Sequence, residues 1–419
     1  MTTDNNAKKQ LRVAVIGDPH FYREGSTSRS GVSHIQLNET GNFINTQPQQ
    51  NPWTGLCELV DEQEIRADVL LCVGDITFGA EKVGLVKAWA ELQMLAIKMG
   101  AGLIASATGN HDVSSRSIAE KVGKNPSVEM STAFGLFEQL KLLSPSYPAL
   151  TIKNGVVEDN SLLRTKYFGD SFVLVEGENY RVVILNSCCE HSADAFQQER
   201  GSFPKSAEIA LCEELKKATE DKINILVCHH SPEPHSEHNL GGHDFIENGE
   251  ALLQCLEQHA NWFIVHGHKH HGRLGYAKGA ISSPIVFSTA SLGIKLDSAK
   301  DGMRNQFYCV DIYQKKFGSL YGQVSAWDWN MGMGWRRATR NTGGIYDGCG
   351  FGNRTQLDDL VENIAELVPC SWSEALEKIS TLNFLTPNDM LILEKRLLRH
   401  NIVVQPDSNG YWSEILKKI

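Results

Sequence analysis

The sequence predicts an α/β fold, and three observations support this prediction. Short apolar runs rich in Val, Ile and Leu recur along the chain, and several of them end in Gly followed by Asp, Asn or His. Segments with a helical pattern lie between these runs. Hydrophobic residues make up 41% of the chain, which is enough apolar material to build a sizeable core. Strands that alternate with helices favour βαβ units and a largely parallel sheet.

The expected strands are short and apolar on both faces, as is typical of strands buried within a sheet. They cover residues 11–16, 69–73, 103–107, 223–228 and 262–265. The helices expected between them cover residues 53–65, 83–99, 204–219 and 249–259. Further strands at 172–175, 181–186, 284–289 and 307–311 suggest a second sheet packed on the first.

Composition and charge exclude several classes of protein. The chain has 419 residues with 40 basic and 50 acidic side chains, so its formal charge of -10 gives no general attraction to nucleic acid or to an anionic membrane. No apolar run approaches the roughly 18 to 20 residues of a membrane-spanning helix, and the polar N-terminal segment does not resemble a signal peptide. The ten cysteines are scattered, so we expect them to be reduced in a cytoplasmic protein.

Polar side chains capable of chemistry follow the expected strands and do not precede them. In an open α/β sheet the carboxyl ends of the strands carry the functional site, so these residues should meet at one edge. A single Gly-Asp or Gly-Asn pair could be a simple turn. Five strand ends in a row that carry such residues, four of them with His, are not expected from turns alone. The clusters are Gly17-Asp18-Pro19-His20, Gly74-Asp75, Gly109-Asn110-His111-Asp112, His229-His230 and His266-Gly267-His268-Lys269-His270.

These clusters supply a set of metal ligands that contains carboxylates, an amide and imidazoles but no thiolate. Such a set suits Mn²⁺, Fe or Zn²⁺. Seven ligands are too many for one tetrahedral ion, whereas two ions that share a carboxylate would use all of them. The set consists of Asp18, His20, Asp75, Asn110, His229, His268 and His270.

The ordered motifs resemble those of the calcineurin-like metallophosphoesterase superfamily. The matching blocks are Asp-x-His, Gly-Asp, Gly-Asn-His-Asp, a His at a strand end and Gly-His-x-His, and they span residues 18–270. The resemblance implies a two-sheet αββα sandwich. It also implies that Asp18, His20 and His270 hold one metal, that Asn110, His229 and His268 hold the other, and that Asp75 bridges both.

The same resemblance implies roles for two further residues. His111 would lie over the substrate as a proton donor or oxyanion stabiliser, and Asp112 would orient the His111 imidazole. His230 is an alternative to His229 as a ligand, although His229 is preferred because it directly follows the apolar run.

The activity expected from this resemblance is hydrolysis of a phosphoric ester with two divalent ions, Mn²⁺ first and Fe or Zn²⁺ as alternatives, and a metal-bridging hydroxide as nucleophile. Asp112 stands where protein phosphatases of the superfamily usually carry Glu, which favours a phosphodiesterase acting on a small or nucleotide-like substrate. Nucleic acid is a less favoured partner because of the net charge. The alternatives are a phosphomonoesterase or protein phosphatase, and a scaffold protein that retains the fold without activity.

Three parts are expected along the chain. Residues 1–325 would form the catalytic domain, with the polar segment 22–52 as a candidate lid, and residues 326–352 a linker or closing segment. Residues 353–419 would form a small helical C-terminal module. Helices followed by a hairpin could make a winged-helix module. Because acidic residues outnumber basic ones there, we expect protein docking or oligomerisation and not DNA binding.

Other candidates are weaker. Cys188-Cys189 could be redox-active, but a vicinal pair at a strand end is expected to be inert. Four loop histidines and three arginines could contact substrate or phosphate, or could be ordinary solvated side chains. These are His191, His235, His238, His243, Arg23, Arg116 and Arg273.

Overall fold

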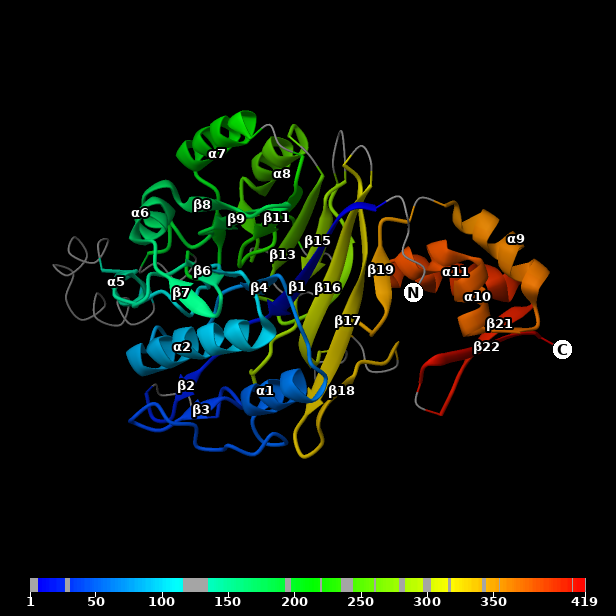
Figure 1. Ribbon diagram of the computed structural model, residues 1–419, viewed down its shortest axis with the longest axis horizontal. Helices are drawn as coiled ribbons and strands as arrows, with labels where there is room; N and C mark the ends of the chain where they lie inside the picture. The colour runs from blue at the N-terminus through cyan, green and yellow to red at the C-terminus, as the bar shows by residue number, and fades with distance from the viewer. Residues whose placement is uncertain are drawn as a thin grey trace.

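The structure, a computed structural model, consists of two β-sheets packed face to face between layers of helices, with a smaller module beside them (Figure 1). It describes residues 7–26, 31–115, 135–192, 197–218, 221–234, 244–259, 261–278, 283–296, 303–315, 318–340, 344–353, 355–408 and 410–418. The predicted αββα sandwich is therefore confirmed.

The larger sheet carries the first three predicted strands at its centre. Within it, β1, β4 and β5 are parallel neighbours, whereas β16 and β6 flank them in the antiparallel sense. In spatial order the strands are β18 (Gly334–Arg337), β17 (Leu320–Asn330), β16 (Asn305–Lys315), β1 (Ala7–Ile16), β4 (Val69–Cys72), β5 (Leu103–Ser106), β6 (Ala149–Lys153) and β7 (Val156–Glu158), and β19 (Cys349–Phe351) pairs with β17.

The smaller sheet carries the other two strands that lead into predicted site residues. Here β9, β11, β13 and β15 run parallel, and the two outer strands are antiparallel to their neighbours. In order the strands are β14 (Arg273–Tyr276), β15 (Ile285–Ser288), β13 (Trp262–His266), β11 (Ile223–Val227), β9 (Tyr180–Leu185) and β8 (Phe172–Glu176). Both sheets are thus mixed, which differs from the largely parallel sheet that we expected.

The core follows the two-residue period of the strands. In β11, Ile225 and Val227 face the larger sheet, whereas Leu226 packs in a separate apolar cluster with α7 (Lys205–Lys217) and α8 (Gly249–Glu257). The same alternation holds in β13, where Val265 points inward and Ile264 outward. Because both faces of these strands are buried, their sequences are mostly apolar and show no alternation, with Asn224 in β11 and His266 in β13 as buried polar exceptions.

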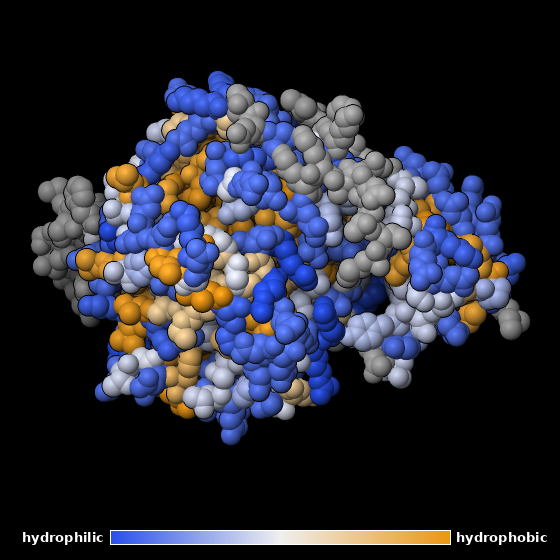
Figure 2. All heavy atoms as spheres, viewed as in Figure 1, coloured by the Kyte–Doolittle hydropathy of each residue, from blue (hydrophilic) through white to orange (hydrophobic). Residues whose placement is uncertain are grey.

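Helices cover the outer faces of both sheets. In Figure 1, α1 (Pro52–Glu62) and α2 (Lys82–Met99) lie along the larger sheet, and α7 and α8 lie over the smaller one. Shorter helices α5 (Glu138–Lys141) and α6 (Ser161–Asp170) lie near the edge. The four predicted helices are confirmed to within a few residues. In Figure 2, hydrophilic side chains cover much of the face in view, and apolar ones gather around α2, whose Val86, Met94 and Ile97 are exposed.

One prediction about the cysteines is wrong. Cys212 in α7 and Cys255 in α8 form a disulfide across the two packed helices, so the cysteines are not all reduced. The sequence could not reveal this pairing because the two residues are 43 positions apart. The other eight cysteines are free thiols.

The larger sheet continues beyond the domain boundary expected at residue 325. Strand β17 crosses this position, and residues 334–337 and 349–351 add β18 and β19 to the same sheet. The segment expected as a linker or closing segment therefore contributes strands that close the sheet. Trp327 and Trp329 lie on β17, and Trp335 lies on β18.

The C-terminal residues form a module with its own apolar core, separate from the sandwich core. In Figure 1 it lies beside β19, at the edge of the larger sheet. The elements are α9 (Leu357–Leu367), β20 (Cys370–Ser371), α10 (Trp372–Lys378), a 3₁₀ helix (Ser380–Phe384), α11 (Pro387–Arg399), β21 (Ile402–Pro406) and β22 (Trp412–Lys417). Two of its helices have side-chain caps at their N-termini: Ser371 accepts the N–H of Glu374, and Thr386 accepts that of Asp389.

The described part of the polar segment 22–52, residues 22–26 and 31–52, packs against the end of the larger sheet. It contains the paired short strands β2 (Tyr22–Arg23) and β3 (Gln36–Leu37). The indoles of Trp329 and Trp335 donate to the carbonyls of Pro48 and Pro52, at 3.1 and 2.9 Å. The role of this segment as a lid stays a prediction. Two further short strands, β10 (Gly201–Ser202) and β12 (Ile246–Glu247), pair near the other sheet. Within the described ranges, every helix is too short or too polar to cross a bilayer.

Candidate metal centre

The predicted ligands converge at the carboxyl ends of five strands from both sheets. Asp18 and His20 follow β1, Asp75 follows β4, and Asn110 follows β5. From the facing sheet, His229 follows β11, and His268 and His270 follow β13. The fold therefore brings all seven side chains, which are far apart in sequence, to one place.

The first group of ligands is Asp18, His20, Asp75 and His270, which offer ligand atoms that all lie within 4.8 Å of one another. His20 Nε2 lies 3.2 Å from His270 Nε2 and 3.7 Å from Asp75 Oδ2. His270 Nε2 lies 4.0 Å from Asp18 Oδ1. Two imidazoles and two carboxylates converging in this way are a complete ligand set for one hard or borderline cation.

The second group surrounds His229. Its Nε2 atom lies 3.1 Å from Asn110 Oδ1 and 3.5 Å from Asp75 Oδ2, and its ring centroid is 5.0 Å from that of His268. Its Nδ1 atom is 2.9 Å from the Val73 carbonyl. A carbonyl can only accept, so Nδ1 carries the proton and the lone pair of Nε2 points into the site, the arrangement expected of a metal ligand.

Asp75 lies between the two groups. Its Oδ2 atom is 3.7 Å from His20 Nε2 on one side and 3.5 Å from His229 Nε2 on the other. Its Oδ1 atom accepts the backbone N–H of His111 at 2.7 Å, which fixes the carboxylate plane. One carboxylate in this position can serve both groups.

The backbone at the strand ends is strained. Asp18, His20, Asp75, His268 and His270 all have positive φ, between 37° and 75°. Residues other than glycine seldom adopt this left-handed conformation, and it persists where the surrounding structure enforces it, as it often does at functional sites. Here all five of these residues contribute side chains to the two ligand groups.

Two glycines of the motifs are required by close packing at the site. A Cβ atom on Gly109 would lie 2.1 Å from Asp75 Oδ1 and 2.2 Å from Asp75 N. A Cβ atom on Gly267 would lie 2.5 Å from Asp18 Oδ2. Any side chain at these positions would push a ligand carboxylate away, so the glycines belong to the site although they carry no chemistry.

The electrostatics of the site fit a bound cation. Asp18, Asp75 and Asp112 are all buried, and Oδ2 of Asp18 has no hydrogen-bond partner among the described residues. Burial raises the pKa of Asp18 well above its usual value. Burial likewise lowers the pKa of His229 well below its usual range, which keeps the imidazole neutral. Buried carboxylates and neutral imidazoles that converge are costly on their own and are stabilised by positive charge.

His111 lies at the edge of this group and is partly exposed. Its ring stacks on Phe78 with centroids 4.3 Å apart and an interplanar angle of 22°, and it meets the His20 ring edge-on at 5.2 Å. The N–H of Ala80 donates to its carbonyl at 2.6 Å. The His111 imidazole is therefore held beside the ligands but belongs to neither ligand group.

The Asp112 carboxylate links the loops after β4 and β5 by hydrogen bonds. Its Oδ1 atom accepts the N–H of Thr77 at 3.0 Å, and its Oδ2 atom accepts the N–H of Gly109 at 2.9 Å. Burial raises the pKa of this carboxyl to about 7. These contacts position the loops after β4 and β5, and the role of Asp112 in orienting the His111 ring stays a prediction.

Three residues beside the site were missed from the sequence. The amide of Asn110 donates to the Gln198 carbonyl at 3.2 Å and lies 3.3 Å from Glu199 Oε2, which directs Asn110 Oδ1 towards His229. The polar connection after β9 was the only available signal. Phe78 was missed too, although it closely follows the Gly74-Asp75 motif.

His230 also lies in this region. It is buried, and burial lowers the pKa of its imidazole well below the usual range. Its ligand atoms lie within 4.8 Å of those of His229 and His268, and also of those of Cys188 and His191. His229, with its Asn110 and Asp75 contacts, is the better placed ligand for the second group.

The remaining candidates have mixed outcomes. His191 is buried, and so is not the exposed loop residue that was the alternative to a substrate contact. Arg23 pairs with Glu81 at 3.0 Å. Arg273 lines a cavity of about 440 Å³ together with Ser231 and His266. His235, His238, His243 and Arg116 lie outside the described residues.

Comparison with protein-family models agrees with this geometry. A family model described as calcineurin-like phosphoesterase matches residues 11–272, and a winged helix-turn-helix model, wHTH-Calcineurin_assc, matches residues 349–399. No curated protein matches the chain significantly. A single mutant and a double mutant of Vps29 from Entamoeba histolytica align at 9% identity over 76% of this chain and 92% of theirs, with TM-scores of 0.27 and 0.26. The phosphoesterase match covers more than half of the chain.

Proposed function

Because the chain belongs to the calcineurin-like phosphoesterase family, it is a metal-dependent phosphoester hydrolase, and we propose that it prefers small or nucleotide-like phosphodiesters. The observation that supports a dinuclear hydrolytic centre is the position of Asp75, whose Oδ2 lies between His20 Nε2 and His229 Nε2. A carboxylate shared by two ligand groups is the hallmark of a dinuclear hydrolytic site.

The ligand groups would each hold one divalent ion. When bound, the ions would neutralise phosphoryl oxygens and lower the pKa of a water molecule towards neutrality. Asp75 would serve both ions, with Asp18, His20 and His270 around one and Asn110, His229 and His268 around the other. The donors are oxygen and imidazole nitrogen, which suit Mn²⁺ best, with Fe and Zn²⁺ as alternatives.

The chain's own residues perform the other tasks. Because His111 is partly exposed and stacked on Phe78, its imidazole can reach a substrate while its orientation stays fixed. It would give a proton to the leaving oxygen. Glu199 and the Gln198 carbonyl would hold the Asn110 amide, so that its oxygen stays turned inward.

The diester preference rests on two properties of the sequence. Asp112 replaces the Glu that is usual in protein phosphatases of the superfamily, and a formal charge of -10 disfavours long nucleic acids. A phosphomonoester carries more negative charge than a diester at neutral pH, so it gains more from an extra cationic side chain. Among the candidate arginines, Arg23 is already paired with Glu81.

Hydrolysis of a bis-aryl phosphate and the matching mono-aryl phosphate tests this preference. We expect kcat/KM with Mn²⁺ to be at least about tenfold higher for the diester. Equal or higher kcat/KM for the monoester would contradict the diester proposal and leave the family assignment intact. Repeating both assays with Zn²⁺ and Fe²⁺ would rank the metals.

The C-terminal module is proposed to mediate protein contacts and not to bind DNA. It carries a winged helix-turn-helix match, but acidic side chains exceed basic ones in residues 353–419. Absence of DNA binding at low salt, where electrostatic attraction is strongest, is the expected result. Because eight of the ten cysteines are free thiols, we also propose a cytoplasmic location.

A further inference from the structure

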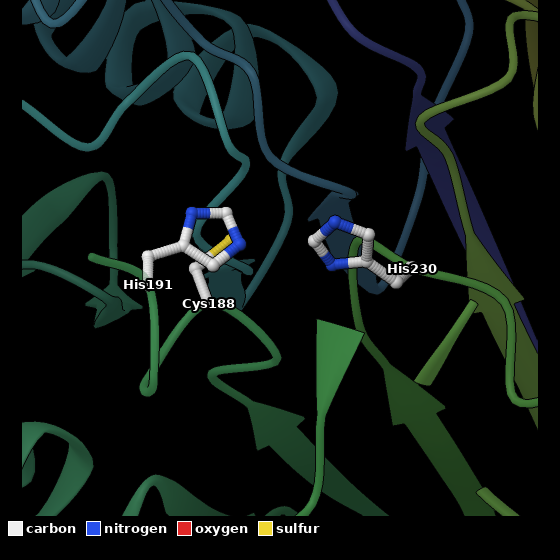
Figure 3. Close-up of side chains that lie close together, drawn as sticks. All are labelled: Cys188, His191 and His230. Atoms are coloured by element: carbon white, nitrogen blue, oxygen red, sulfur yellow. The ribbon is translucent and has the colours of Figure 1, made fainter. Parts of the chain in front are cut away.

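A third group of potential metal ligands lies beside the proposed dinuclear centre and differs from it in chemistry. Cys188, His191 and His230 are all buried, and one ligand atom from each lies within 4.8 Å of the others. Figure 3 shows the His191 ring next to the Cys188 sulfur, with His230 facing the two from a separate segment of chain. No group of the dinuclear centre contains a thiol.

The fold brings these residues together through two neighbouring parallel strands. β9 and β11 pair so that Ile184 lies opposite Val227, and their carboxyl ends share one edge of the sheet. Cys188 and His191 follow β9, and His230 follows β11. The dinuclear centre is also built at the carboxyl ends of neighbouring strands, and β9 is the next strand beside β11 in the smaller sheet.

The loop after β9 is folded so that Cys188 and His191 face the same side. The N–H of His191 donates to the Cys188 carbonyl at 3.0 Å, and the N–H of Cys188 donates to Asn186 Oδ1 at 3.2 Å. These bonds close a tight turn over a Cys-x-x-His sequence. Such short ligand spacings are common in metal sites because one turn presents both side chains to the same ion.

The hydrogen bonds of the two imidazoles leave suitable donor atoms. His191 Nε2 lies 2.9 Å from the Arg200 carbonyl, which can only accept, so Nε2 is protonated and Nδ1 carries the lone pair. His230 Nδ1 lies 2.9 Å from Ser187 Oγ, and its buried Nε2 has no hydrogen-bond partner among the described residues. An outer partner on one ring nitrogen and a lone pair on the other is the usual state of a ligating histidine.

The Cys188 thiol completes the group. Its Sγ donates to the Thr108 carbonyl at 3.3 Å, so the thiol is protonated in this structure. Binding an ion would release that proton to solvent and form a metal–thiolate bond. In a tetrahedral zinc site, with bonds of about 2.0 to 2.3 Å, neighbouring ligand atoms are about 3.5 Å apart. The three ligand atoms here lie within 4.8 Å of one another, so the side chains would move inward on binding an ion.

We propose that Cys188, His191 and His230 form a third metal site, which takes Zn²⁺ and lies next to the phosphoesterase centre. A thiolate with two imidazoles is a borderline-soft donor set that favours Zn²⁺ over Mn²⁺. Three protein ligands leave one position of a tetrahedral ion for water or a substrate oxygen. The assignment also gives His230 a ligand role of its own, while His229, which contacts Asn110 and Asp75, remains the ligand of the dinuclear centre.

Cobalt substitution tests this site with a readout that does not depend on activity. The full-length protein is stripped with a chelator and titrated with Co²⁺, which gives a near-ultraviolet charge-transfer band only when a thiolate is bound. We expect wild type to bind about three ions per chain and to show the band. Cys188→Ser should lose the band and one ion, whereas Cys189→Ser, the change at the adjacent cysteine, should lose neither.

Further variants separate this proposal from the proposed function. Asp75→Asn should abolish hydrolysis but keep the thiolate band, and His191→Asn should lose the band without loss of the dinuclear ions. The proposal is overturned if wild type shows no thiolate band, or if the band survives in Cys188→Ser. It is equally overturned if His230→Asn loses an ion but keeps the band, because His230 would then belong to the dinuclear centre.

Discussion

Asp75 is the side chain on which both ligand groups converge. Its two oxygens have different tasks, because Oδ2 faces His20 and His229 while Oδ1 holds the backbone N–H of His111. The hydrogen bond would survive replacement by an amide of the same shape, whereas the charge shared by two cations would not. The roles of charge and shape can therefore be separated at this residue.

Asp75→Asn is expected to reduce kcat on a bis-aryl phosphate with Mn²⁺ by about 10³-fold or more, because the charge that holds both ions is lost. The measurement is steady-state kinetics together with metal content per chain. Asp61→Asn is the matched control, since Asp61 is an exposed carboxylate on α1 paired with Lys98, and it should change kcat by less than about twofold. A loss of only a few-fold in Asp75→Asn would contradict a shared carboxylate.

His111→Ala tests proton donation separately from metal binding. The ring stacks on Phe78 and lies outside both ligand groups, so its removal should leave the metal content unchanged. We expect kcat to fall by about 10² to 10⁴. The loss should be smaller for substrates with good leaving groups, which need no proton. His400→Ala, at an exposed position in the C-terminal module, is the control and should have no effect. Equal losses for good and poor leaving groups would argue against proton donation.

At the scale of elements, the site depends on how closely the loops after neighbouring strands approach each other. The Asp112 carboxylate bonds to Thr77 N and Gly109 N, and a Cβ on Gly109 would overlap Asp75. The loops after β4 and β5 are therefore fixed against each other before any ion binds. The close approach of the two loops depends on how β4 and β5 pack, and neither sequence motif alone predicts it.

Gly109→Ala should displace Asp75, because the added Cβ would lie 2.1 Å from Asp75 Oδ1. We expect loss of at least one bound ion and a fall in kcat of about 10²-fold or more. Gly169→Ala in α6 is the matched control. It meets no atom within 4 Å and should leave activity unchanged, with a gain in stability of about 0.5 to 1 kcal/mol. Normal metal content in Gly109→Ala would show that the loops can move apart.

Helix α11 offers an independent prediction for the C-terminal module. Thr386 caps it by accepting the N–H of Asp389 at 3.2 Å and donating to Asp389 Oδ2 at 2.8 Å. Thr386→Ala should destabilise the module by about 0.5 to 2 kcal/mol, seen as faster amide hydrogen exchange in α11. Hydrolysis should not change. Asn388→Ala, an exposed position in the same first turn, is expected to leave exchange unaffected.

At the scale of the whole molecule, the centre joins two sheets that meet only in the folded chain. Asp18, Asp75 and Asn110 come from the larger sheet, and His229, His268 and His270 come from the smaller one. Bound ions should therefore stabilise the packing of the two sheets against each other. Without ions, the buried carboxylates destabilise the same packing.

The stability of metal-free protein should depend on pH through Asp112. Burial raises the pKa of its carboxyl to about 7, whereas an unfolded Asp titrates near about 3.9. Between these values the folded state keeps a proton that the unfolded state has lost, so its contribution to the free energy of unfolding falls as pH rises towards 7 and levels off above it. Urea unfolding of chelator-treated protein at about pH 5.5 to 8 measures this.

The Asp112→Asn variant isolates this contribution, since histidine contributions cancel when it is compared with wild type. The unfolding free energy of the variant should fall less steeply with rising pH than that of wild type. Parallel pH profiles for the two proteins would mean that Asp112 is ionised in the folded state. Adding Mn²⁺ should also flatten the wild-type profile, because cations offset the ionised carboxylates.

The sequence determined the types of residue in the site and the ends of the strands that carry them. The apolar runs located β1, β4, β5, β11 and β13, because strands buried on both faces must be apolar throughout. The order of the motifs resembles that of the calcineurin-like phosphoesterases, and this resemblance implied the αββα sandwich. The strand ends indicated where the site lies, since polar clusters that follow parallel strands converge at one edge.

Tertiary structure alone decided the contacts between residues that are distant in sequence. It paired Cys212 with Cys255, placed Glu199 beside Asn110, and joined the tryptophan-rich strand to the larger sheet. It also buried His191 next to Cys188 and His230, where the sequence left a substrate contact and an exposed loop position equally open. A local pattern records which residues a strand carries, but the packing of the two sheets decides which of those residues meet.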